Sequence, residues 1–126
     1  MDIERTMLWA GLLGFLAIGL ALFTAFQRMA VDTALGGDDD LLVKKSRAFG
    51  NLVEHAPLML IMMMLLENDG SEGLIHFLGF LFFGCRLAHA YGLIYMEGMG
   101  PSNLGRMVGA LGSWGLMGLA ALLCIF

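Results

Sequence analysis

Three polar side chains lie at helical spacing within an apolar stretch of this sequence. Arg47, Asn51 and Glu54 fall at i, i+4 and i+7, which would place them on one face of an α-helix. An almost purely apolar run follows at 58–66. Polar and charged groups are costly in hydrocarbon, so this cluster indicates a binding or catalytic site. The alternative interpretation is an ion pair between helices that only stabilises a bundle.

The composition is that of a membrane protein. Of the 126 residues, 59% are hydrophobic and 14% are charged, against roughly 45–50% and 25% in a soluble domain. The formal net charge is -4 and no basic block is present, which argues against a nucleic-acid partner. Cys85 and Cys124 lie in apolar segments without metal-ligand spacing. We therefore expect neither a metal site nor a disulfide framework.

Four stretches are long and apolar enough to cross a bilayer, which requires about 20 helical residues. They lie at about 6–27, 41–67, 73–96 and 103–126. We therefore expect an all-α membrane protein, a bundle of four transmembrane helices forming one domain over residues 1–126. The first stretch is too long for a typical signal-peptide core and has no clear cleavage site, so we interpret it as a retained span.

The segments between the expected helices carry turn and capping signals. Aspartates at 38–40 could cap the second helix, and Ser102 could cap the fourth. Residues 67–72 are expected to form a tight turn, and the glycines and proline at 98–102 to end the third helix. In the fourth helix, Gly105 and Gly109 form a small-xxx-small pair, which favours close helix packing in lipid.

Basic residues set the expected orientation in the membrane. The segment between the second and third helices has none, whereas those around the first and third loops do. The positive-inside rule therefore places the first and third loops in the cytoplasm and both termini outside. The residues concerned are Arg28, Lys44, Lys45, Arg47 and Arg106.

Polar residues of the second and third helices are expected to meet at one depth. Counted from the turn between these helices, Glu54 and Arg86 each lie about 20 Å away at ~1.5 Å per residue. We therefore predict a buried Glu54–Arg86 ion pair. Asn51 and His89 would lie one helical turn nearer the cytoplasm, with Arg47 close to the mouth.

The predicted cavity would suit a small anionic ligand that also carries an amine. Arg28, Arg47 and Arg106 would surround its mouth, with a carboxylate deeper in. Arg106 lies in the first turn of the fourth helix, where backbone N–H groups and the helix dipole add positive potential. Such potential would drive a bound thiol toward the thiolate. The alternative for Arg106 is an interfacial anchor that contacts lipid phosphate.

Two histidines could reach the same cavity. His55 and His89 are the pair that a bis-histidine haem would require, but no further feature of the sequence supports haem. His76 is expected near the outer interface.

At these residues the chain resembles the MAPEG family, the membrane-associated proteins of eicosanoid and glutathione metabolism. The shared pattern is Arg-x-x-x-Asn-x-x-Glu-x-x-Pro, here Arg47, Asn51, Glu54 and Pro57. The segments at 50–54 and 86–92 are most similar to the short bacterial members. The resemblance covers nearly the whole chain and implies a multi-pass protein of the bacterial inner membrane. It also implies a homotrimer that binds glutathione between adjacent protomers.

The resemblance further implies a role for each site residue. Arg47 and Asn51 would bind glutathione carboxylate or peptide groups, and Glu54 the γ-glutamyl amine. Arg106 would activate the thiol as the catalytic residue, and a neighbouring protomer would contribute an arginine of helix one. His55 and His89 stand where many eukaryotic members have tyrosine, as does Leu93. The expected glutathione-binding set is Arg28, Arg47, Asn51, Glu54, His55, Arg86 and His89.

Three functions are compatible with this sequence. The first is a glutathione transferase or peroxidase, with glutathione as co-substrate, no metal, and a hydrophobic second substrate arriving from the lipid. The second is a non-catalytic lipid- or ligand-binding scaffold of the same fold. The third is a small multidrug transporter, whose transport carboxylate would be expected on the first helix. That helix carries no charge between Arg5 and Arg28, which argues against the transporter.

Overall fold

Four long helices make up most of the chain in this computed structural model, which describes residues 2–98 and 100–126. They are α1 (Glu4–Ala30), α2 (Asp40–Asn68), α3 (Glu72–Tyr95) and α4 (Leu104–Ile125). Each is long and apolar enough to cross a membrane, which confirms the predicted four-helix membrane fold. Met99, within the predicted break before the fourth helix, lies outside the described residues.

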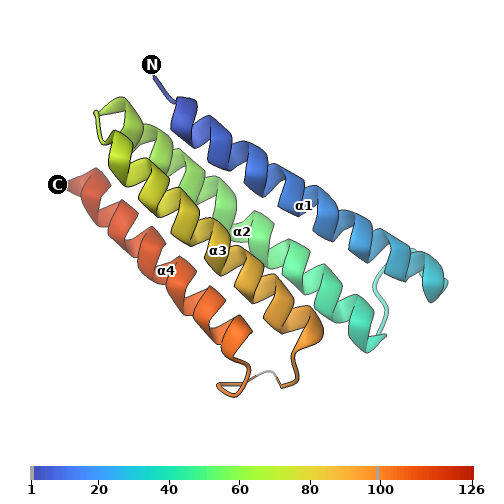
Figure 1. Cartoon of the computed structure of the whole chain (residues 1–126). Helices are drawn as coiled ribbons and strands as arrows, with labels where there is room; N and C mark the ends of the chain where they lie inside the picture. Colours follow the sequence, from blue (N-terminus) through green and yellow to red (C-terminus); the bar gives the residue numbers. More distant parts are fainter. Residues whose placement is uncertain (1, 99) are drawn as a thin grey trace.

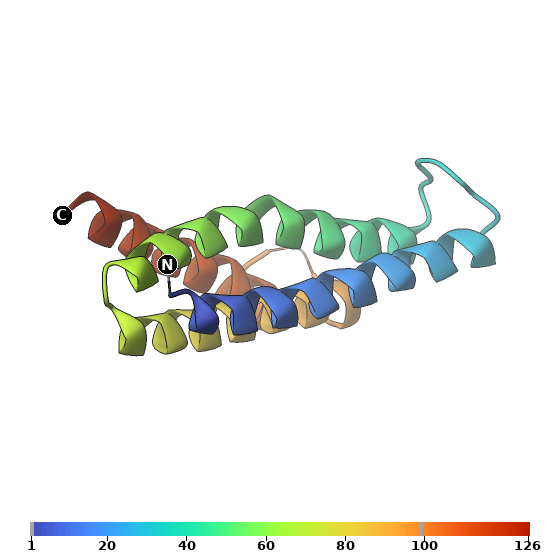
Figure 2. The same ribbon diagram turned by 90° about the horizontal axis from the view of Figure 1, so that it is seen from above.

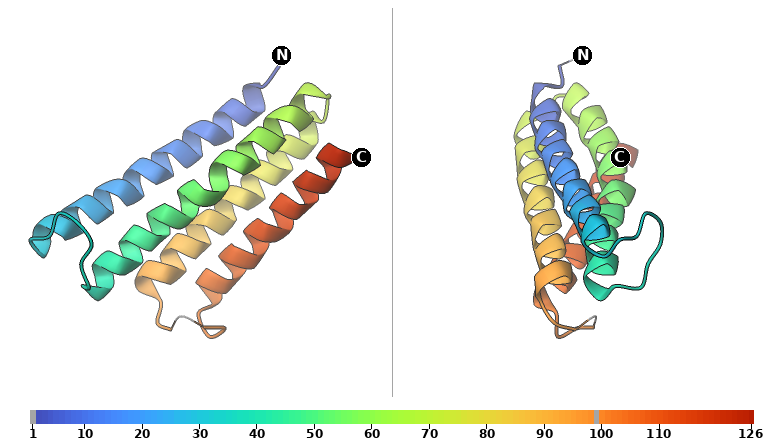
Figure 3. Two further views of the ribbon diagram at one scale, coloured as in Figure 1. Left: turned by 180° about the vertical axis from the view of Figure 1, so that it is seen from behind. Right: turned by 90° about the vertical axis from the view of Figure 1, so that its right-hand side faces the viewer.

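Successive helices run in opposite directions, so that both termini and the α2–α3 turn lie at one end of the bundle (Figure 1). We call this the terminal end, and the opposite end, with the α1–α2 and α3–α4 connections, the loop end. The views in Figure 2 and Figure 3 show α1 against the α2–α3 hairpin. Over the described residues α4 contacts α2 and α3 but not α1. The two central helices therefore connect the outer ones.

Apolar side chains lie on both the inside and the outside of the bundle. Met59, Met63 and Phe82 are fully buried between the helices. Large apolar side chains such as Phe15 and Phe80 point outward and are 77% and 69% exposed. An apolar exterior is the surface that lipid requires of a membrane-spanning bundle.

The α3–α4 contact depends on glycine. A Cβ atom built on Gly109 would lie 2.5 Å from the carbonyl oxygen of Cys85 and from the backbone nitrogen of His89. A Cβ on Gly105 would lie 3.0 Å from the carbonyl oxygen of Ala88. The predicted small-residue pair therefore faces α3 and allows the two backbones to approach closely.

The cap of α4 differs from the predicted one. Asn103, rather than Ser102, accepts the hydrogen bond from the backbone nitrogen of Arg106 at 3.1 Å. Its amide nitrogen donates to the carbonyl oxygens of Gly92 at 2.8 Å and Gly98 at 3.0 Å. A carboxamide has both an acceptor and donors, so one buried side chain joins the end of α3 to the start of α4. At α2 the aspartate prediction is confirmed, because Asp39 accepts from the backbone nitrogen of Leu42.

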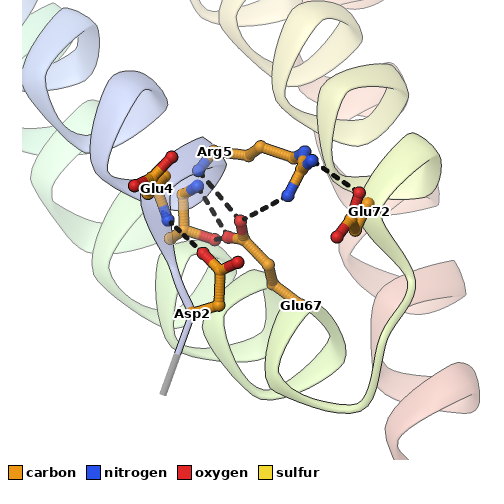
Figure 4. Close-up of polar contacts among 6 residues, drawn as sticks. Asp2, Glu4, Arg5, Glu67 and Glu72 are labelled. Atoms are coloured by element: carbon orange, nitrogen blue, oxygen red, sulfur yellow. Dashed lines mark hydrogen bonds and ion pairs between the residues drawn. The ribbon is translucent and has the colours of Figure 1, made fainter.

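Glu67, expected in a turn, is instead buried in the last turn of α2. Its carboxylate accepts hydrogen bonds from the backbone nitrogens of Arg5 at 2.9 Å and Thr6 at 2.8 Å, and from the Thr6 hydroxyl at 2.6 Å. Figure 4 shows Arg5 between Glu67 and the exposed Glu72, with ion pairs of 3.6 Å and 2.5 Å. A carboxylate of α2 thus caps α1, where unpaired N–H groups and the helix dipole favour negative charge.

The cap predicts that Glu67 matters for stability and Glu72 does not. In detergent, Glu67→Gln should lower the apparent melting temperature by about 5 °C or more, because an amide nitrogen would then face buried donors. Glu72→Gln removes the other carboxylate paired with Arg5, but at the surface, where an ion pair contributes about 1 kcal/mol or less. The melting temperatures can be measured by circular dichroism. Equal values for the two variants would contradict this role of Glu67.

A second pair of variants tests the close α3–α4 contact. Gly109→Ala should destabilise the protein by about 1–3 kcal/mol, since the added methyl group meets backbone atoms of α3. Gly118→Ala on the same helix is the control, because a Cβ there meets nothing within 4 Å. Thermal unfolding should show the control at or slightly above the wild type, as expected for alanine in a helix.

Candidate functional site

A cavity of about 150 Å³ lies near the loop end of the bundle, where α2, α3 and α4 meet. It is lined by Arg47, Asn51, His89, Leu93 and Arg106. The cavity therefore brings together four of the predicted site residues from three helices. Two guanidinium groups and the N-terminus of α4 give it a positive potential suited to an anion.

Arg86 lies behind this cavity and does not pair with Glu54. It is 3% exposed, and its Nε donates to the Ser113 hydroxyl at 2.8 Å. Its Nη2 donates to the Gly109 carbonyl oxygen at 2.9 Å, and its Nη1 donates to Oδ1 of Asn51. The predicted Glu54–Arg86 ion pair is therefore wrong. Counting residues from the turn estimates the heights of Cα atoms, but the long arginine side chain reaches to Asn51, one turn from Glu54 on α2.

Glu54 instead pairs with Arg47 on the outer face of α2. Their side chains are 54% and 56% exposed, with 3.4 Å between Glu54 Oε1 and Arg47 Nη2. Glu54 does not line the cavity described above. This face therefore presents two charges at its surface, within a helix long and apolar enough to span a membrane.

Arg28 lines a different cavity, also of about 150 Å³, beside the α1–α2 connection. Its Nη1 donates to the Gly36 carbonyl oxygen at 3.0 Å. Arg47 and Ser46 line this second cavity as well. Arg47 thus lies between the two cavities, and Arg28 does not line the one that contains Arg106.

His55 is held at both ring nitrogens. Its Nδ1 lies 2.6 Å from the Asn51 carbonyl oxygen, and its Nε2 lies 3.1 Å from the indole nitrogen of Trp114. A carbonyl only accepts and an indole only donates, so the ring carries its proton on Nδ1. Both nitrogens are thus occupied by protein partners, which leaves none for a haem iron. Among residues 2–98 and 100–126, no three His, Cys, Asp or Glu side chains are grouped to hold a metal ion.

Two side chains of α4 that contact the site residues were not predicted. Ser113 is the only hydroxyl-bearing residue between positions 104 and 126, and this isolation in an apolar run was the available signal. Trp114 carries the next polar donor along the helix. Both lie within one or two turns of Gly109, where the α4 backbone lies close to that of α3.

A comparison with models of protein families identifies the family of this chain. The model of the MAPEG family matches residues 6–126. No curated protein matches the chain. The family includes glutathione transferases and peroxidases as well as non-catalytic binding proteins. Because the match covers nearly the whole of a four-span helical bundle, the chain belongs to the MAPEG family of membrane proteins.

Proposed function

We propose that the protein binds glutathione in the cavity of Arg47, Asn51 and Arg106 and activates its thiol. The observation that carries this proposal is the convergence of two arginines and a carboxamide on one cavity at the start of α4. Glutathione carries two carboxylates and two peptide groups, and Arg47 and Asn51 would bind groups of these kinds. His89 and Leu93 line the remaining wall.

Arg106 is the proposed catalytic residue. It lies in the first turn of α4, where the helix dipole adds to its own charge. Positive charge beside a thiol lowers its pKa and so raises the thiolate fraction at neutral pH. The thiolate would form a sulfur–carbon bond with a lipophilic electrophile such as an aryl halide, whose carbon–halogen bond breaks to release the halide ion. With a hydroperoxide it would take the terminal oxygen and release an alcohol, after which a second glutathione would give the disulfide and water.

We also propose that the complete site forms between protomers of a homotrimer. A cavity of about 150 Å³ is smaller than the roughly 300–1,000 Å³ of typical ligand sites. Glu54 and Arg47 lie exposed on a membrane helix, and charged groups facing lipid are costly. A neighbouring copy covering this face would enlarge the site, and would bring its Arg28 to the ligand while Glu54 binds the amine.

The second substrate would reach the site from the lipid. An apolar groove of about 170 Å³ runs between α1 and α2 and includes Leu52 and Val53, which lie on a different side of α2 from Asn51. Its lining is entirely apolar, as a lipophilic electrophile requires.

Turnover distinguishes the enzyme from a non-catalytic binding protein of the same family. Purified protein should conjugate glutathione to an aryl halide or reduce a lipid hydroperoxide. Arg106→Ala should abolish turnover and the far-ultraviolet absorbance of bound thiolate while glutathione binding weakens only modestly. Arg106→Lys keeps the charge and is the matched control. Glutathione binding without turnover in the wild type would identify a binding protein, and full turnover in Arg106→Ala would exclude Arg106 as the activating residue.

We further infer that the loop end faces the cytoplasm of a bacterial inner membrane. The support is the basic residues at this end, together with the position of both termini at the other. The site would then open toward the cytosol, which contains small thiols.

Cysteine labelling tests this orientation. In a background with Cys85→Ala and Cys124→Ala, Asp69→Cys in the α2–α3 turn should react with a membrane-impermeant maleimide in intact spheroplasts. Asp38→Cys in the α1–α2 connection should react only after lysis. The reverse pattern would place the loop end outside.

A further inference from the structure

The buried Arg86 guanidinium is bound by neutral oxygen atoms. Its three hydrogen bonds reach a hydroxyl, a backbone carbonyl and a carboxamide, on Ser113, Gly109 and Asn51. Its Cζ lies 5.7 Å from the centre of the fully buried Phe82 ring. Since protein groups take all three nitrogens, Arg86 is held in one orientation behind the cavity rather than inside it.

Ser113 and Gly109 set that orientation from α4. The Ser113 hydroxyl donates to the Gly109 carbonyl oxygen at 2.7 Å and accepts from Arg86 Nε at 2.8 Å. Ser113 is fully buried. The Gly109 carbonyl oxygen also accepts from Arg86 Nη2, so the hydroxyl and the guanidinium share one acceptor.

This arrangement determines what Asn51 can offer a ligand. A guanidinium has donors and no acceptor, so Asn51 must present its carboxamide oxygen to Arg86. Its amide nitrogen then points away from Arg86, and Asn51 also lines the cavity. What Asn51 can offer the cavity is therefore two N–H donors, and a ligand there must supply a hydrogen-bond acceptor.

We propose that Ser113 and Arg86 are positioning residues that fix Asn51 as a donor and so make this cavity selective for carboxylate or carbonyl oxygens. The inference rests on the proposed function, because it assigns to Asn51 an acceptor group of glutathione. Arg86 would then act on the ligand through Asn51, rather than by the direct contact expected from the sequence. A cationic group placed against the Asn51 amide nitrogen would meet only donors and would be rejected.

Variants at Ser113 test this role with matched shapes. Thr and Val have the same shape, so they perturb packing equally, but only Thr keeps the hydroxyl. Ser113→Val should weaken glutathione binding about tenfold relative to Ser113→Thr, the loss expected when a hydrogen bond to a charged group is no longer made well. Ser113→Ala, which adds no bulk, should behave like Val. Equal affinity in the Thr and Val proteins would overturn the proposal.

Asn51→Asp tests the donor directly. A carboxylate still accepts from Arg86, so the fold should be kept, but it offers the cavity an acceptor in place of a donor. Glutathione affinity should fall at least about tenfold with an unchanged melting temperature. Unchanged affinity would contradict the donor assignment.

A double-mutant cycle separates positioning from general damage. If Ser113 acts only through Asn51, Ser113→Val should cause no further loss of affinity in an Asn51→Ala background. Additive losses would indicate a merely structural role and overturn the proposal.

The ligand-free protein provides a readout independent of glutathione. The chain has only four side-chain carboxamides, on Gln27, Asn51, Asn68 and Asn103, so their amide NMR signals can be assigned by substitution. The Asn51 signals should move in Ser113→Val and stay close to the wild type in Ser113→Thr. If the wild type binds no glutathione, the proposed function fails, and these signals alone decide whether Ser113 and Arg86 orient Asn51. Signals that do not respond to Ser113→Val overturn the proposal in either case.

Discussion

A guanidinium group buried among apolar helices must find its hydrogen-bond partners within the protein, because lipid provides none. Arg86 meets this requirement with oxygen atoms from α2 and α4, so that one side chain of α3 joins three helices. The Arg86 side chain can reach its α4 partners only if the backbones of α3 and α4 lie close together. Gly109 allows this close approach because it has no side chain. The packing of α3 against α4 and the position of Asn51 at the cavity therefore both depend on the hydrogen bonds of Arg86.

The two ends of the bundle use charge in different ways. At the terminal end, the buried Glu67 is fully occupied by the first turn of α1 and by Arg5. Its partners all belong to the protein, which suits a structural connection. At the loop end, the two arginines Arg47 and Arg106 line a cavity together with Asn51. Positive charge gathered around a cavity favours an anionic ligand.

Side chains that complete the hydrogen bonds of a helix end or a ring also fix the orientation of neighbouring residues. Asn103 caps α4 and closes α3 with a single side chain, which holds Arg106 at a helix start. Trp114 and the Asn51 carbonyl hold the His55 ring in one tautomer. Contacts within the protein thus fix the start of α4 and the His55 ring, and such pre-organisation would reduce the entropy lost on binding.

Much of the fold could be predicted from the sequence, because span length and apolar composition follow directly from bilayer thickness. The small-residue pair Gly105–Gly109 and the aspartate cap of α2 were also readable, since both depend on local spacing. Glu67 and Asn103 were not. Each has partners on another helix, and no local pattern distinguishes a glutamate in a turn from one that caps a distant helix.

For the site, the sequence by itself determined that polar residues share one helix face and that arginines gather at one end of the bundle. It could not determine which of them meet. The prediction of a Glu54–Arg86 pair followed from helical rise, which estimates depth but ignores side-chain length and the direction in which α3 faces α2. Only the packing of α4 against α3 supplied Ser113 and Gly109 as partners for Arg86. Tertiary structure therefore decided which groups point into the cavity and which support it from behind, because hydrogen bonds form over about 3 Å and a rotation of one helix replaces every partner.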